Sequence, residues 1–148
     1  MKGLDLYFCS FSDFAKPFRD DEILYNQARQ FWSHLNNIAW VVFGIAIIVG
    51  IGSAVSYYTV YNNMPNRHYR PMHWWLFMLC TLLFTLVVTI SIELCFANTS
   101  LNGALWVEWK VALINMIYAV SAFCATSFVW CNTSLPTNAY RYLKIGKR

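Results

Sequence analysis

Three long stretches of mostly apolar residues dominate the hydropathy pattern of the chain, at 38–58, 73–96 and 111–130. Each has about 20 residues or slightly more, which is the length at which an α-helix crosses roughly 30 Å of hydrocarbon. Tryptophan and tyrosine lie near the ends of all three, where aromatic side chains favour the boundary between headgroups and hydrocarbon. The pattern predicts an all-α integral membrane protein with a three-helix transmembrane domain over 38–130.

The segment 1–37 shows a different pattern, in which apolar residues recur at spacings of three and four. This periodicity predicts an amphipathic helix with a phenylalanine face. The face comprises Phe8, Phe11, Phe14 and Phe18. Pro17 should break or kink this helix, and Asp20 or Asp21 can cap a second helix that leads into the first span. We expect the face to lie on the bilayer surface, and the alternative is a docking helix for a partner subunit.

Small residues in the first and third spans predict helix-packing surfaces. Ala46, Gly50 and Ala54 follow one another at intervals of four in the first span, and the third span carries Ala119 and Ala122. Small side chains let two membrane helices approach closely, which favours association where lipid gives no hydrophobic driving force. The partner helix can belong to the same chain or to another one.

The second span carries a polar stripe, formed by Thr81, Thr85, Thr89 and Glu93 at intervals of four. Successive members drift by about 40° around the helix, so the stripe covers roughly 120° of its face. An intramembrane carboxylate is costly, and it marks a functional site by default, here a cation or proton site or a buried interhelical hydrogen bond. Two plainer interpretations compete: Glu93 is close enough to the end of the span to reach interfacial water, and threonine hydroxyls can bond carbonyls of their own helix.

Asn115 in the third span offers a polar partner for this stripe. The second span ends just after Glu93 and the third begins just before Asn115, so the two residues should lie at similar depth. We therefore predict a contact between Glu93 and Asn115 that joins the second and third helices into a hairpin. Such a bond between membrane helices contributes roughly 0.6 to 2 kcal/mol.

Composition agrees with a membrane location, because 58% of residues are hydrophobic and 12% are charged. A soluble domain carries about 25% charged residues. The net charge is +4, and the basic residues are too dispersed for a nucleic-acid surface. Those near the spans fall mainly on one side, in the first loop and in a basic and aromatic tail at 131–148: Arg67, Arg70, Arg141, Lys144, Lys147 and Arg148. This bias predicts headgroup contacts by these residues, an outside N-terminus and a cytoplasmic C-terminus.

Candidate chemistry changes this picture little. The five cysteines form no CxxC pair, and no histidine or carboxylate stands at metal-ligand spacing. The sequence has no catalytic triad, phosphate-binding glycine loop or HExxH motif. We therefore expect a non-enzymatic protein without metal or cofactor.

Two functions remain open. The first is a non-catalytic subunit, structural or anchoring, that packs into a larger membrane assembly with other subunits or with copies of itself. The second is a homo-oligomeric pore or channel lined by the polar stripe, with Glu93 as a charged ring. Three spans with an outside N-terminus and a basic inside tail resemble the topology of class I phage holins, which implies the pore. We prefer the subunit, because apolar residues interleave with the threonines and a pore lining should be polar along most of its length.

Overall fold

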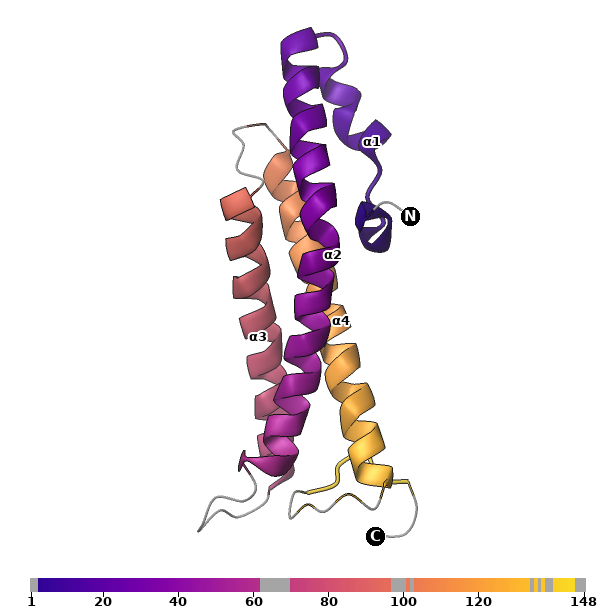
Figure 1. The fold of residues 1–148 in the computed structure, drawn as a ribbon, viewed down its shortest axis with the longest axis vertical. Helices are drawn as coiled ribbons and strands as arrows, with labels where there is room; N and C mark the ends of the chain where they lie inside the picture. The colour runs from indigo at the N-terminus through magenta and orange to yellow at the C-terminus, as the bar shows by residue number, and fades with distance from the viewer. Residues whose placement is uncertain are drawn as a thin grey trace. The chain divides into compact units, whose positions relative to one another are not determined.

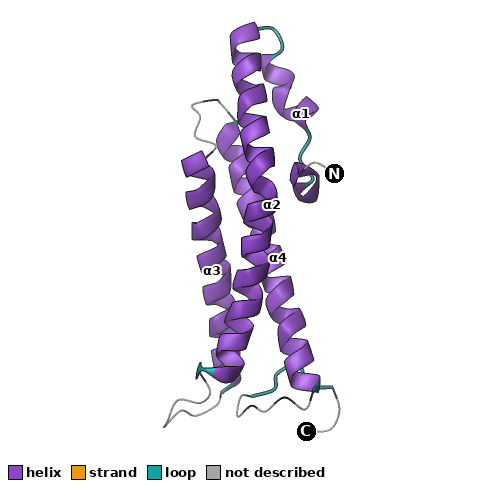
Figure 2. Cartoon of the chain, in the orientation of Figure 1, coloured by secondary structure: helices purple, strands orange, loops and turns teal. Residues whose placement is uncertain are grey.

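The computed structural model describes residues 3–61, 70–96, 101, 103–133, 135, 137 and 140–145. Every regular element in this part of the chain is helical (Figures 1 and 2). In chain order the elements are η1 (Gly3–Tyr7), α1 (Phe11–Ala15), η2 (Lys16–Phe18), α2 (Glu22–Thr59), α3 (Pro71–Phe96) and α4 (Ala104–Asn132).

The three helices α2, α3 and α4 are each long and apolar enough to cross a membrane. The predicted spans 38–58, 73–96 and 111–130 lie within them in that order. The predicted all-helical fold is therefore confirmed for the described residues, as is the prediction of three helices with the length and hydropathy of membrane spans. The chain is accordingly compatible with a multi-pass membrane protein.

Helix α2 begins at Glu22, well before the apolar run that identified the first span. Asp21 caps it, because Oδ1 accepts hydrogen bonds from the backbone N–H groups of Ile23 at 2.9 Å and Leu24 at 3.2 Å. These donors have no partner within the helix, so a side-chain acceptor at this position stabilises the first turn. The predicted cap is confirmed for Asp21. At 38 residues, α2 is roughly 57 Å long, so part of it extends beyond the hydrocarbon.

The prediction of one amphipathic helix before Pro17 is wrong. Two short helices, η1 and α1, replace it, and η2 follows around the proline. Phe8 separates η1 from α1 with a φ of 53°, in the left-handed region that a residue with a Cβ seldom adopts. The left-handed residue marks the break between η1 and α1, which no helical periodicity could have indicated.

The chain divides into two compact units. The first, here called the N-terminal unit, comprises Met1–Ile45 and Leu86–Asn115. The second, the C-terminal unit, comprises Ala46–Thr85 and Met116–Arg148. Each of the three long helices contributes residues to both units, and each unit has its own core.

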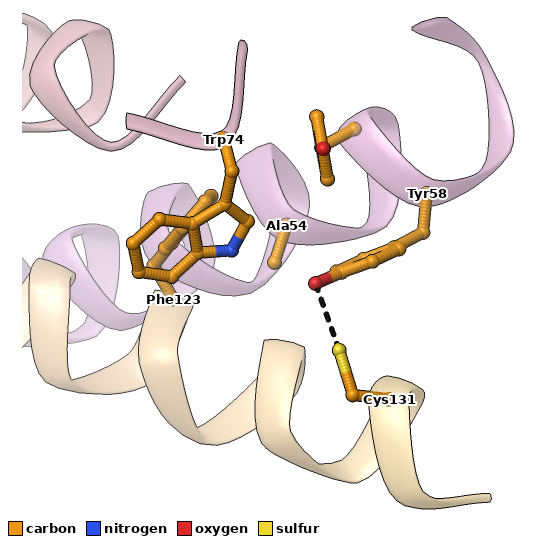
Figure 3. Packing of buried hydrophobic residues seen from close by; sticks show 6 residues of the cluster. Ala54, Tyr58, Trp74, Phe123 and Cys131 are labelled. Atoms are coloured by element: carbon orange, nitrogen blue, oxygen red, sulfur yellow. Dashed lines mark hydrogen bonds between the residues drawn. The ribbon is translucent and has the colours of Figure 1, made fainter. Parts of the chain in front are cut away.

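An aromatic cluster forms the core of the C-terminal unit (Figure 3). Its buried members are Ala54, Tyr57, Tyr58, Trp74, Phe123 and Cys131. Two polar contacts lie inside this core: the Tyr58 hydroxyl lies 3.3 Å from the Cys131 sulfur, and Trp74 Nε1 donates to Ser127 Oγ at 3.3 Å. Aromatic bulk and internal hydrogen bonds thus fix helices α2, α3 and α4 together in this unit.

Two of the three helices of the C-terminal unit approach closely at Gly50. A Cβ at this position would collide with the carbonyl oxygen of Ala119 and would lie 2.9 Å from the Cβ of Ala122. Ala46, Ala54 and Ala119 are fully buried, and Ala122 is partly buried. The structure thus brings Gly50 against Ala119 and Ala122, within one chain.

The C-terminal tail folds back on the end of α4. Asn132 donates from Nδ2 to the carbonyl of Leu143 at 3.0 Å and accepts at Oδ1 from the backbone N–H of Ile145 at 2.8 Å. Tyr142 stacks on Trp74 with ring centroids 4.9 Å apart. The described part of the tail is therefore attached to the C-terminal unit by polar and aromatic contacts.

Candidate functional site

The polar stripe of α3 faces the interior of the chain. Thr81, Thr85, Thr89 and Glu93 are all buried. In the C-terminal unit, Thr81 Oγ1 donates to the carbonyl of Phe77 at 2.8 Å, and Thr85 Oγ1 donates to the carbonyl of Thr81 at 2.8 Å. These two hydroxyls are bonded to their own helix, which satisfies them without any ligand.

Asn115 is the centre of a polar network in the N-terminal unit, where it is fully buried. Its Nδ2 donates to Thr89 Oγ1 at 3.3 Å, and its Oδ1 lies 2.8 Å from the Tyr7 hydroxyl. The same hydroxyl lies 3.2 Å from the carbonyl oxygen of Ala39. A phenol has one hydrogen to donate, and the shorter distance favours Asn115. The network therefore joins α3, α4 and the N-terminal segment that precedes α2 and contains η1, α1 and η2.

The predicted hydrogen bond between Glu93 and Asn115 is wrong. Glu93 has 0% of its surface exposed, and neither of its carboxylate oxygens has a hydrogen-bond partner among the described residues. Asn115 bonds Thr89 instead, one helical turn before Glu93. The prediction placed the right two helices side by side but shifted their register by one turn.

Glu108 is a second buried acid in the N-terminal unit, with 6% of its surface exposed. Its carboxyl group is close enough to that of Glu93 for the two to interact electrostatically. The predicted third span began at 111, so Glu108 was assigned to a loop, whereas α4 begins at Ala104. Glu108 and Asn115 are seven residues apart, so they lie on nearly the same face of a helix. This spacing could have identified Glu108 as a member of the third helix.

Two further polar groups lie near these acids. Burial raises the pKa of the Cys9 thiol above its ordinary value, the positive charge of Lys110 opposes that rise, and a charged Glu93 adds to it. Lys110 donates from Nζ to the carbonyl oxygen of Phe8 at 2.7 Å. Lys110 thus bonds the residue that separates η1 from α1, and no salt bridge joins it to Glu93 in the described part of the chain.

The predicted phenylalanine face packs largely on α2 of the same chain. Phe14 stacks on Trp32 with ring centroids 5.6 Å apart, and Phe11 contacts the edge of the same indole at 5.6 Å. Phe18 is buried, whereas Phe8 is 80% exposed. Three of the four phenylalanines, all except Phe8, thus pack against other residues of the same chain.

A pocket of about 460 Å³ lies in the N-terminal unit, between the N-terminal segment and helices α2 and α4. Its lining combines apolar rings with a few polar groups: Phe8, Cys9, Ser10, Asp13, Phe14, Pro17, Trp32, Gly103, Trp106, Val107 and Lys110. Cys9 and Lys110 therefore both border this space. No group of three histidine, cysteine or acidic residues suited to a metal ion occurs among the residues described.

The basic residues predicted to contact headgroups have different surroundings. Arg70 and Lys144 are exposed. Arg141 is partly buried, and its guanidinium donates to the carbonyls of Cys131 at 3.4 Å, Thr133 at 3.3 Å and Leu135 at 3.0 Å. The remaining three, Arg67, Lys147 and Arg148, lie outside the described residues.

Comparison with known proteins supplies no relative from which a function could be carried over. No family model, curated protein or solved structure matches the chain significantly.

Proposed function

We propose that this chain is a non-catalytic, multi-pass membrane subunit that packs into a larger membrane assembly in a structural or anchoring role. The observation that carries the proposal is the burial of the polar stripe. Thr81 and Thr85 bond their own helix, and Thr89 bonds Asn115 within the N-terminal unit. The hydroxyls of the stripe are thereby used inside one chain, and apart from Ser91 the outward positions of α3 are apolar. They include Leu79, Leu83, Phe84 and Val87. Such a face suits lipid or another membrane helix.

Within this proposal, the N-terminal unit lies at one membrane surface and Phe8 inserts among the lipids. Phe8 and Trp106 are the most exposed aromatic residues bordering its pocket, at 80% and 74%. Large rings at the level of the headgroups anchor a protein at that depth. In the same proposal, Arg70 and Lys144 contact anionic headgroups, the N-terminus is outside and the C-terminus is in the cytoplasm.

The alternative is a homo-oligomeric pore lined by the same stripe. A pore lining must face water along most of its length. The burial of Thr81, Thr85 and Thr89 in one chain supports the subunit over the pore, because the packing that buries them would have to open before they met a water column.

Native mass spectrometry after mild detergent extraction, paired with ion flux into liposomes of the purified protein, tests the proposal. The purified chain should form no symmetric homo-oligomer and should conduct no ions. Extracted from its native membrane, it should be recovered at fixed stoichiometry with different chains. A symmetric homo-oligomer whose conductance changes in Glu93→Gln would contradict the proposal.

A further inference from the structure

Glu93 stands apart from every other polar group of the stripe because its carboxyl group has no hydrogen-bond donor. Both of its oxygens are buried, and neither has a partner among the described residues. An isolated ionised carboxylate in apolar surroundings carries a desolvation cost so large that the group ordinarily takes up a proton instead. The hydroxyl and amide groups of the neighbouring network do not relieve this cost, because neither oxygen of Glu93 accepts a hydrogen bond from them. Asn115 instead bonds Thr89 and Tyr7.

The charged and titratable groups near Glu93 do not supply a counter-ion. The group of α4 that interacts electrostatically with Glu93 is Glu108, another acid, and the group of the N-terminal segment that does so is the Cys9 thiol. Lys110 is held by the carbonyl of Phe8. The buried residues that α2 contributes to this unit carry no titratable group: Ala28, Phe31, Leu35, Ala39 and Val42.

We propose that Glu93 and Glu108 form a proton-binding pair in the N-terminal unit, with a proton held on Glu93 at neutral pH. Two carboxylates that share a site cannot both ionise at low cost, so one proton bound by the pair removes their mutual repulsion. The uptake is one proton from water onto one carboxylate oxygen of Glu93, and release returns it to water. Glu108 keeps a small exposed surface, whereas Glu93 has none, so Glu93 is the member that retains the proton.

A proton suits this site better than a metal cation does. A cation such as Mg²⁺ or Ca²⁺ requires six or more oxygen ligands. The oxygens of Thr89 and Asn115 beside Glu93 are already hydrogen-bonded, and no cluster suited to a metal occurs in the described residues. The proposal is independent of whether the chain has partner subunits, so the two can fail separately.

Infrared spectroscopy of the full chain in lipid nanodiscs tests the proposal through the carbonyl stretch of a protonated carboxylic acid. Labelling glutamate alone with carbon-13 moves the bands of Glu22, Glu93 and Glu108 away from those of the aspartates. We expect the wild type to show a protonated glutamate band at pH 7. The band should be lost in Glu93→Gln and kept in Glu22→Gln, the matched change at an exposed glutamate.

A second variant keeps the proposal testable if the Glu93→Gln variant does not fold. The double variant Glu22→Gln, Glu108→Gln leaves Glu93 as the only glutamate in the chain. Its band should persist at pH 7 and disappear at a lower pH than in the wild type, because the repulsion by Glu108 is gone. Three results would overturn the proposal: no protonated glutamate at pH 7, a band unchanged in Glu93→Gln, or loss of the band on adding sodium or potassium at constant pH.

Discussion

At the scale of single residues, the most consequential side chain is Tyr7, which lies fully buried with its hydroxyl at Asn115. This contact joins residues 108 positions apart in the sequence. It attaches the N-terminal segment to a polar residue of α4, which in turn bonds Thr89 of α3. A buried hydrogen bond of this kind matters mainly because its loss leaves unpaired polar atoms in the core.

Replacing Tyr7 with phenylalanine should destabilise the protein by about 1–3 kcal/mol, because Asn115 Oδ1 loses its donor inside the core. The measurement is the free energy of unfolding in mixed detergent micelles. Tyr25→Phe is the matched control, since the Tyr25 ring also contacts Phe11 but its hydroxyl has no hydrogen bond among the described residues. Equal effects of the two changes would contradict this role for Tyr7.

The polar stripe could be recognised from the sequence, but the residues that contact it could not. The interval of four placed Thr81, Thr85, Thr89 and Glu93 on one side of a helix, and the structure buries all four. The insertion of Tyr7 could not be predicted, because its partners Ala39 and Asn115 lie far away in the sequence. Glu108 was missed for a different reason: hydropathy places the start of α4 too late, since a charged residue in its first turns lowers the local average.

At the scale of elements, the helix ends and the close approaches determine what each helix can contact. The cap at Asp21 begins α2 far ahead of its apolar run, and the absence of a side chain at Gly50 lets α2 approach α4 within the C-terminal unit. Both features were indicated by the sequence, because capping and small-residue spacing are local signals. The division of the N-terminal segment into η1, α1 and η2 was not, because it depends on tertiary contacts with α2.

Asp21→Ala should lower stability by about 1 kcal/mol, since the first-turn N–H groups of Ile23 and Leu24 lose their acceptor. Thermal unfolding in detergent measures the change. The neighbouring Asp20→Ala removes an exposed acid with no capping bond and should leave the midpoint nearly unchanged. A larger loss of stability for Asp20→Ala than for Asp21→Ala would show that Asp21 is not the capping residue.

Gly50→Ala should destabilise the protein by about 1–3 kcal/mol, because the added methyl collides with the backbone of Ala119. Gly52 is the matched control on the same helix, with nothing within 4 Å of an added Cβ. Gly52→Ala should be neutral or stabilising by up to about 1 kcal/mol, since alanine is the better helix former. The measurement is the unfolding free energy of both variants, and equal destabilisation would contradict the close approach.

At the scale of the whole molecule, the composition and the three apolar runs were sufficient to predict a membrane protein with three spans. We expect the two termini on opposite sides of the membrane if all three helices cross it. The direction depends on the basic residues, of which Arg70 and Lys144 are exposed at described positions. Hydropathy specifies the number of crossings well because the cost of burying charge in hydrocarbon is large.

Epitope tags at the two ends should show opposite protease accessibility in sealed, right-side-out vesicles. The N-terminal tag should be cleaved from outside, and the C-terminal tag should be cleaved only after the vesicles are permeabilised. Reversing the charge at Arg70 and Arg141 should increase the fraction of chains with the opposite orientation. Cleavage of both tags from one side would contradict three crossings.

The central claim is that the polar stripe of α3 faces the interior of a single chain, and thiol labelling at position 85 tests it most directly. A cysteine-free protein carrying Thr85→Cys is reconstituted in liposomes and treated with a water-soluble maleimide, with Arg70→Cys as the exposed control. We expect position 85 to stay unlabelled while position 70 reacts fully, and to react only after denaturation. Labelling of position 85 in the folded protein would show that water reaches the stripe, as a pore requires.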